Sequence, residues 1–156
     1  MVEYQRKDRY DINDLRDIMS ILRSPQGCPW DREQIHKSIR NDFIEEVYEA
    51  IEAIDLEDTE LLKEELGDVL LQIIFHCRIE EEKSCFDFDD ICDELCKKLI
   101  IRHPHVFGDA EADSSVQVLK NWEEIKRQEK EGKSWIESPL KEIPKELPSL
   151  ARASKV

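Results

Sequence analysis

The 156 residues suffice for one domain with a hydrophobic core and are too few for two full domains. Charged residues make up 38% of the chain, and only 4 glycines and 6 prolines interrupt it, which favours helices over a turn-rich sheet protein. The net charge of −14 opposes non-specific binding to nucleic acid, and no segment resembles a membrane span or a signal peptide. We therefore expect a cytoplasmic protein that binds neither nucleic acid nor membrane.

Hydrophobic periodicity and capping residues predict five helices, of which the first two lie in the N-terminal third. The first runs from about Ile12 to Arg23, with Asp11 as its N-cap. Two prolines and a glycine then mark residues 24–31 as a loop. The second spans roughly Ser38 to Ile54, and one side of it is apolar: Ile39, Phe43, Val47, Ala50, Ile51 and Ile54.

The third predicted helix decides the architecture. Asp58 or Thr59 caps it, it reaches about Glu82, and its segment Val69–Ile79 is apolar on nearly every side. A helix that is apolar all round must be buried all round, and one short chain offers few neighbours to cover it. We therefore expect a homodimer or a dimer of dimers that completes the burial of this helix, at Leu70, Leu71, Ile74 and Phe75.

Two further helices are predicted in the C-terminal half. One is capped by Asp87 and ends near His103, because Pro104 follows in a loop. The other runs from about Ser114 to Glu131 and ends at Gly132. Three prolines interrupt the residues beyond Gly132. The sequence thus predicts an all-α helical bundle over residues 1–132, followed by a proline-punctuated tail or connector over residues 133–156.

Carboxylates are concentrated on the second and third predicted helices. Glu46 and Glu49 are three residues apart on one helix, and Glu65 and Asp68 are three apart on the other, so each pair lies on one helical face. If the two helices are antiparallel neighbours, the pairs converge. Four oxygen donors, with other positions left to water and phosphate, suit Mg²⁺. A bound cation would also offset the repulsion between an acidic protein and a phosphate substrate.

A solvated acidic face is the alternative interpretation of these carboxylates. For the second helix alone it is the simpler one, because the glutamates lie opposite the apolar side. It fits Glu65 and Asp68 less well, because they lie among apolar side chains directly before the buried segment. An unpaired carboxylate is costly to bury there. The two helices together favour a metal site.

These carboxylates resemble a family signature. Glu45–Glu49 (EEVYE) and Glu65–Asp68 (ELGD) resemble the EExxE…ExxD signature of the MazG family of all-α nucleoside triphosphate pyrophosphohydrolases. The likeness extends over about residues 10–132, and the C-terminal residues resemble the connector to a second repeat in two-repeat members. Four flanking segments also resemble MazG: Cys28–His36 (CPWDREQIH), Lys63–His76 (KEELGDVLLQIIFH), Arg102–Asp109 (RHPHVFGD) and Asn121–Lys130 (NWEEIKRQEK).

The resemblance implies a reaction and a role for each site residue. It implies hydrolysis of nucleoside triphosphates to a nucleoside monophosphate and pyrophosphate, for the cleaning or regulation of nucleotide pools. The implied cofactor is Mg²⁺, with Mn²⁺ as the alternative. The implied metal ligands are Glu46, Glu49, Glu65 and Asp68, with Glu45 as a further catalytic carboxylate. Lys98, Arg102 and Trp122 match residues that contact the nucleotide.

One position departs from the family pattern. The family commonly has two adjacent arginines where this chain has Ile101 and Arg102, so one positive charge near the phosphates is missing. This departure supports an alternative function, a catalytically weak MazG repeat that binds nucleotide or serves as a dimerisation module. The complete set of carboxylates argues for the enzyme.

Overall fold

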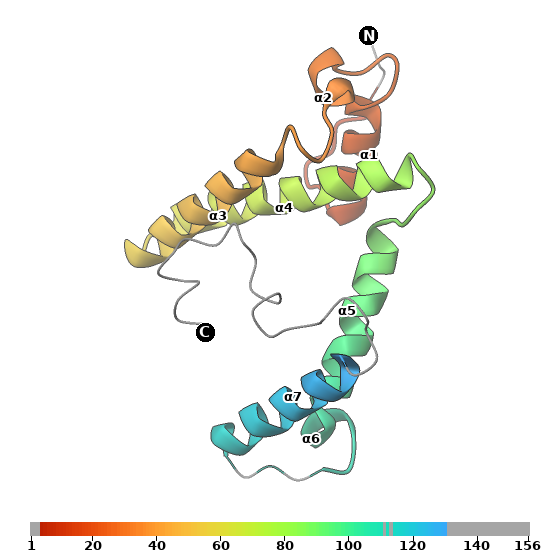
Figure 1. Ribbon diagram of the computed structural model, residues 1–156. Helices are drawn as coiled ribbons and strands as arrows, with labels where there is room; N and C mark the ends of the chain where they lie inside the picture. Colours follow the sequence, from red (N-terminus) through yellow and green to blue (C-terminus); the bar gives the residue numbers. More distant parts are fainter. Residues whose placement is uncertain (1–3, 111, 113, 131–156) are drawn as a thin grey trace. The chain divides into compact units, whose positions relative to one another are not determined.

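The computed structural model describes residues 4–110, 112 and 114–130, and in that part of the chain all regular structure is helical (Figure 1). The predicted all-α class is confirmed. Among the described residues, no helix combines the length and apolar character that crossing a bilayer requires. The helices are α1 (Ile12–Leu22), α2 (Pro29–Glu33), α3 (Arg40–Asp55), α4 (Thr59–Glu81), α5 (Phe88–Arg102), α6 (Pro104–Phe107) and α7 (Ser115–Lys130).

The chain divides into two compact units, Met1–Asp93 and Glu94–Val156. The predicted bounds of a bundle over residues 1–132 and a tail over residues 133–156 stay a prediction. The tail and the predicted stop at Gly132 lie outside the described residues.

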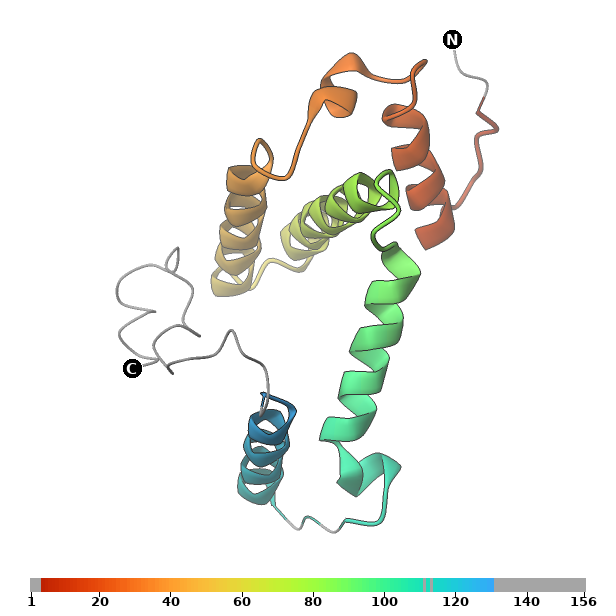
Figure 2. The ribbon, with the colours of Figure 1, turned by 45° about the vertical axis from the view of Figure 1, so that its right-hand side comes forward.

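In the first unit, α4 is the central element. The helices α3 and α4 lie side by side and run in opposite directions, and α1 packs against α4 (Figures 1 and 2). The core consists of Met19 from α1, Ile39 just before α3, and Ile74, Phe75 and Ile79 from α4. This arrangement provides the antiparallel pair of helices that convergence of the carboxylates requires.

Aspartates fix the starts of α1, α4 and α5. Asp11 accepts hydrogen bonds from the backbone N–H groups of Asn13 and Asp14, and the Asp14 carboxylate accepts one from the N–H of Asp11. Asp58 caps α4 by accepting from two backbone N–H groups of its first turn. Asp87 accepts a backbone hydrogen bond at the start of α5 in the same way. These three predicted caps are confirmed.

Two short helices lie where the sequence predicted loops. Pro29 is the first residue of α2, and Pro104 is the first residue of α6. Proline needs no hydrogen-bond acceptor for a backbone N–H, and its φ is close to the helical value, so it can begin a helix as well as end one. The prediction of loops at these positions is wrong, because it treated both prolines only as helix breakers.

The single chain already covers part of the apolar segment of α4. Ile74 is 2% exposed and Phe75 is 4% exposed. The expectation that one chain cannot bury these two side chains is therefore wrong, because α1 and Ile39 cover them. Leu70 and Leu71 are partly buried against the same core.

The apolar side of α3, in contrast, is largely exposed. Val47 is 39% exposed, Ile51 is 44% exposed and Ile54 is 57% exposed. The small side chains of Ala50 and Ala53 are buried instead. Helix α3 therefore packs against α4 through alanines and glutamates, and it leaves its larger apolar side chains uncovered.

Candidate metal site

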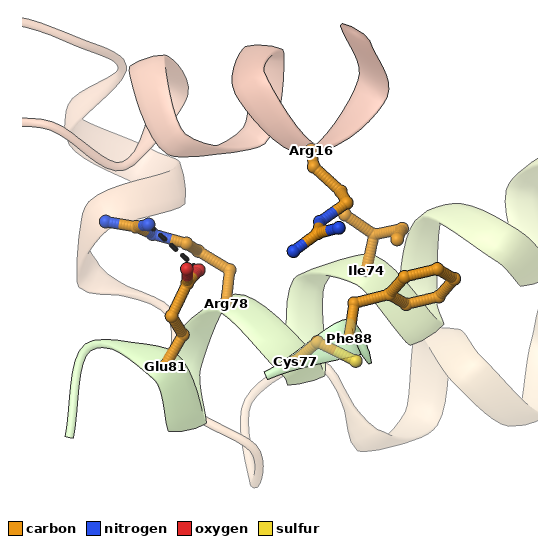
Figure 3. Close-up of a pocket in the computed structure, with 6 residues that line it drawn as sticks. All are labelled: Arg16, Ile74, Cys77, Arg78, Glu81 and Phe88. Carbon is orange, nitrogen blue, oxygen red and sulfur yellow. Dashed lines mark hydrogen bonds and ion pairs between the residues drawn. The ribbon is translucent and has the colours of Figure 1, made fainter. Parts of the chain in front are cut away.

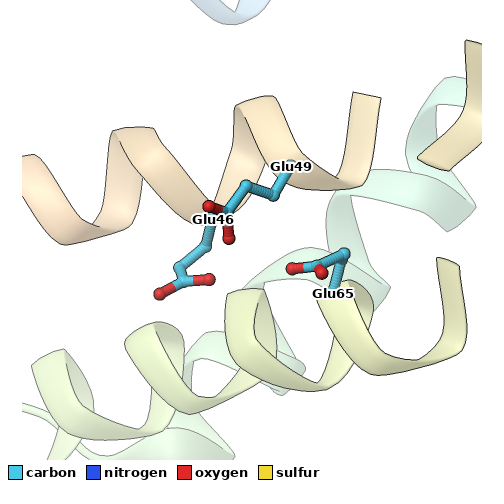
Figure 4. Close-up of side chains that lie close together, drawn as sticks. All are labelled: Glu46, Glu49 and Glu65. Atoms are coloured by element: carbon cyan, nitrogen blue, oxygen red, sulfur yellow. The ribbon is translucent and has the colours of Figure 1, made fainter. Parts of the chain in front are cut away.

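Three carboxylates converge between α3 and α4. Glu46 and Glu49 come from α3 and Glu65 comes from α4, and one carboxylate oxygen of each lies within 4.8 Å of the other two (Figure 4). The three-residue spacing on α3 places both of its glutamates on the side that faces α4. Three of the four predicted metal ligands are thus brought together.

The surroundings of the cluster disfavour the ionised form of its carboxyl groups. Burial raises the pKa of Glu46, and the negative charges of Asp68 and Glu49 raise it further. Burial also raises the pKa of Glu65, again with a contribution from Glu49. The Oε2 atom of Glu65 is buried and has no hydrogen-bond partner among the described residues. A divalent cation would remove this electrostatic cost, because it supplies the missing positive charge.

The remaining predicted carboxylates lie beside this cluster. Asp68 is not one of the three residues that share the 4.8 Å grouping, but its charge contributes to the raised pKa of both Glu46 and Glu65. Glu45 is exposed on α3, and its charge also contributes to the raised pKa of Glu46. Both therefore lie close enough to act electrostatically on the cluster.

The predicted nucleotide contacts belong to the second unit. Arg102 donates to the carboxylate of Glu129 over 2.6 and 3.1 Å, and its guanidinium lies 5.4 Å from the ring centroid of Trp122. The ammonium of Lys126 lies 4.9 Å from the same ring. Lys98 is exposed on α5, one helical turn before Arg102. The structure thus brings Arg102 and Trp122 together, and it adds Glu129 and Lys126, which the sequence prediction missed.

A histidine pair in the first unit was also missed. The Nδ1 atoms of His36 and His76 are 2.6 Å apart, and the two rings are stacked with centroids 4.9 Å apart. His36 Nε2 donates to Glu80, whose pKa is lowered to about 2, chiefly by the hydrogen bond from Lys83 and then by that from His36. The spacing of His76 and Glu80 on one face of α4 was the only sequence signal, because His36 lies 40 residues away.

A buried arginine holds the segment before α3 in place. Arg23 is 9% exposed, and it donates to both carboxylate oxygens of Glu82 and to the backbone carbonyls of Asp31 and Gln34. Its guanidinium also lies 5.3 Å from the ring centroid of Phe75. Together with the histidine pair, Arg23 ties this segment to α4 and so positions the start of α3.

A small cavity elsewhere in the first unit is not a substrate site. It lies between α1, α4 and Phe88 (Figure 3) and has a volume of about 10 Å³, which is the space of about one water molecule. The Arg16 guanidinium lies 5.5 Å from the ring centroid of Phe88 and pairs with Asp89 at 2.9 Å. The cavity is lined by Arg16, Ile74, Cys77, Arg78, Glu81 and Phe88.

The sequence of this region matches a known domain. Residues 34–107 match the family model for the MazG nucleotide pyrophosphohydrolase domain. This chain carries a MazG domain. The matched residues include the whole carboxylate cluster, Asp68, and the basic residues Lys98 and Arg102. Trp122 lies outside the matched segment of the MazG domain.

Curated relatives extend the similarity over most of the chain. The nucleoside triphosphate pyrophosphohydrolase/pyrophosphatase MazG of Thermotoga maritima is 48% identical over 145 residues, which are 93% of this chain and 54% of that protein. The nucleoside triphosphate pyrophosphohydrolase of Escherichia coli K12 is 46% identical over 146 residues, 93% of this chain and 55% of that protein. An uncharacterized Bacillus subtilis protein, YabN, is 45% identical over 94% of this chain and 30% of its own length. The chain thus spans about half the length, or less, of these relatives.

A solved structure supports the fold of the MazG domain. The crystal structure of a mazG-related protein from Thermotoga maritima matches with a TM-score of 0.62 and 24% sequence identity. The match covers 74% of this chain and 99% of that chain. At this identity the likeness shows the fold alone.

Proposed function

We propose that this MazG domain hydrolyses nucleoside triphosphates to a nucleoside monophosphate and pyrophosphate, with Mg²⁺ or Mn²⁺ as cofactor, in nucleotide-pool cleaning or regulation. The observation that carries the proposal is the convergence of Glu46, Glu49 and Glu65 between two antiparallel helices. The names of the relatives from Thermotoga maritima and Escherichia coli support the reaction class.

The chemistry of the cluster fits a hard divalent cation. All of its donors are carboxylate oxygens, which Mg²⁺ and Mn²⁺ prefer over nitrogen or sulfur ligands. The unpartnered Oε2 of Glu65 is an acceptor that a cation would satisfy. When bound, the cation supplies positive charge to the phosphate oxygens and lowers the pKa of a coordinated water. Glu46, Glu49, Glu65 and Asp68 hold it in this proposal.

Glu45 is the proposed catalytic base. It is exposed, it precedes the ligand Glu46 on α3, and its charge acts on the cluster. A carboxylate in this place orients the attacking water and accepts its proton as the new P–O bond forms. The anhydride bond between the α- and β-phosphates breaks in the same step, and pyrophosphate leaves from the nucleoside monophosphate. The proton then moves to solvent, because Glu45 is open to water.

Lys98, Arg102 and Trp122 are the proposed contacts to the nucleotide. Lys98 and Arg102 donate hydrogen bonds to the phosphates and stabilise their developing charge. Arg102 is paired with Glu129 in this structure, so a phosphate must displace that carboxylate. Trp122 offers a ring face to the base, a contact that tolerates different bases.

We further propose that a second copy of the chain covers the apolar side of α3. The exposed apolar residues of α3 recur at spacings of three and four along one face, which is the pattern of a helix that packs against another helix. Large exposed apolar patches of this kind mark interaction sites. A homodimer, or a dimer of dimers, would bury them: Ile44, Val47, Tyr48, Ile51 and Ile54.

The alternative function is a catalytically weak repeat that binds nucleotide or serves as a dimerisation module. The observation that favours it is Ile101, which is 56% exposed beside Arg102 and replaces a positive charge with an apolar side chain. The two functions differ in turnover but not in nucleotide binding.

A panel of nucleoside triphosphates separates the two. The chain is incubated with each nucleotide in Mg²⁺ and, as the control, in EDTA, and pyrophosphate release is measured. The enzyme releases pyrophosphate in Mg²⁺ only. Absence of release, together with a melting temperature raised by nucleotide and Mg²⁺, would establish the weak repeat instead.

A further inference from the structure

Gln72 is a buried polar residue of α4 to which the proposed reaction gives no role. The residue is 8% exposed, and its side-chain oxygen Oε1 has no hydrogen-bond partner among the described residues. Buried side-chain oxygens almost always accept a hydrogen bond, from the protein or from water. The unpartnered Oε1 of Gln72 therefore indicates a donor that the described part of the chain does not provide.

Helix geometry places Gln72 on the same side of α4 as the carboxylate cluster. It follows Asp68 by four residues and Glu65 by seven, spacings that keep these side chains on one face. One turn beyond Gln72 is His76, whose ring centroid lies 5.6 Å from that of Phe43 on α3. Glu65, which precedes Gln72 along the same face, lies beside Glu46 and Glu49 of α3. Gln72 thus lies along α4 between residues that contact α3, one helical turn after Asp68 on the face that carries the cluster residue Glu65.

The carboxylates on this face do not satisfy the Gln72 oxygen. Ionised carboxylates such as Asp68 and Glu65 only accept hydrogen bonds, and so do the phosphate oxygens of a nucleotide. A water molecule bound to a cation is a strong donor, because the cation withdraws electron density from its O–H bonds. A coordinated water therefore has the chemistry that this buried oxygen lacks.

We infer that Gln72 Oε1 accepts a hydrogen bond from a water coordinated to the cation that Glu46, Glu49 and Glu65 hold. Gln72 is then a positioning residue, since it orients a ligand of the cation without binding the cation itself. The inference rests on the proposed function, because it requires a cation in the cluster. Partners of this outer kind contribute strongly to metal affinity.

Calorimetric titration of the full chain with Mg²⁺ alone, without nucleotide, tests this role. We expect Gln72→Met to bind Mg²⁺ about tenfold more weakly than the wild type, since methionine keeps the volume and removes the amide oxygen. In EDTA this variant melts at or above the wild-type temperature, because the unpartnered oxygen is gone. Leu70→Met, which introduces the same side chain on the core side of α4, is the matched control and binds Mg²⁺ like the wild type.

A second variant keeps the test decisive if Gln72→Met does not fold. Gln72→Glu retains an acceptor and adds a negative charge beside the cluster, so it binds Mg²⁺ more tightly and is less stable in EDTA. Wild-type Mg²⁺ affinity in either Gln72 variant overturns the inference and leaves the proposed metal site intact. An unchanged Mg²⁺ affinity with a raised KM for nucleotide also overturns it, since the donor is then a substrate hydroxyl. A wild-type protein that does not bind Mg²⁺ overturns the proposed function, and this inference with it.

Discussion

Glu46 and Glu65 are held where an ionised carboxylate is unfavourable in the absence of a cation. Burial is the main cause of the raised pKa of both groups, and neighbouring carboxylates add to it. A carboxyl group whose pKa is higher in the folded state binds more protons there than in the unfolded state. Its contribution to stability is therefore largest at low pH and is lost as the pH rises above the unfolded pKa.

The pH dependence of unfolding follows from these raised pKa values. In EDTA, we expect Glu65→Gln to lose less unfolding free energy than the wild type as the pH rises from about 5 to about 7, because the variant cannot ionise at this position. Urea denaturation at both pH values measures the difference. Identical pH dependence of the two proteins would contradict the raised pKa of Glu65.

Asp68 is the predicted ligand that lies beside the three converging carboxylates. We expect Asp68→Asn to lower turnover and Mg²⁺ affinity by about 10- to 100-fold or more, as loss of a ligand or of its immediate support does. Its metal-free fold is as stable as the wild type or slightly more so, because one of several repelling charges is gone. Kinetics and melting curves with and without Mg²⁺ measure both effects.

A surface carboxylate on the same helix provides the control for Asp68. Glu60→Gln removes an exposed partner of Lys63, so it changes stability by less than about 1 kcal/mol and leaves the Mg²⁺ response intact. If Asp68→Asn behaves like Glu60→Gln, Asp68 is an ordinary surface charge and the assignment is wrong.

At the scale of helices, local signals were sufficient to predict where α1, α4 and α5 begin. Asp11, Asp58 and Asp87 begin α1, α4 and α5 as predicted, because a cap depends only on the residues next to it. Pro29 and Pro104 were misinterpreted, because proline both begins and ends helices. A sequence pattern alone does not distinguish the two uses.

Non-local contacts explain what the sequence could not predict. The spacing of Glu46, Glu49 and Glu65 was enough to predict their convergence, given an antiparallel pair of helices. Which side of α3 would meet α4 depended on the partner helix, so the outward position of Ile51 could not be read from periodicity. The pairing of His36 with His76 joins residues 40 apart, and the spacing of His76 and Glu80 on α4 does not indicate which residue pairs with them.

The close packing of α3 on α4 depends on small side chains. Ala53 is 1% exposed at this contact, so Ala53→Leu overpacks it and lowers the unfolding free energy by about 1–3 kcal/mol. Glu52→Leu places the same side chain on the exposed part of α3 and changes stability by about 0.5 kcal/mol or less. Urea denaturation of both variants tests the packing, and equal stabilities would show that α3 does not meet α4 through Ala53.

At the scale of the whole molecule, the uncovered side of α3 predicts self-association. We expect the wild type to sediment as a dimer or a larger assembly at micromolar concentration. Ile51→Lys should shift it toward the monomer, because the variant places a charge in the apolar contact. Glu52→Lys, on the neighbouring exposed position, leaves the assembly intact. Sedimentation of the wild type as a monomer would contradict the proposed dimer.

In the proposed reaction the carboxylate cluster directs cleavage between the α- and β-phosphates. Phosphorus NMR of a nucleoside triphosphate incubated with the chain and Mg²⁺ tests this cleavage position, with Glu49→Gln as the inactive control. We expect resonances of nucleoside monophosphate and pyrophosphate for the wild type, and unchanged substrate for Glu49→Gln and in EDTA. Nucleoside diphosphate with orthophosphate, or equal pyrophosphate release by Glu49→Gln, would contradict it.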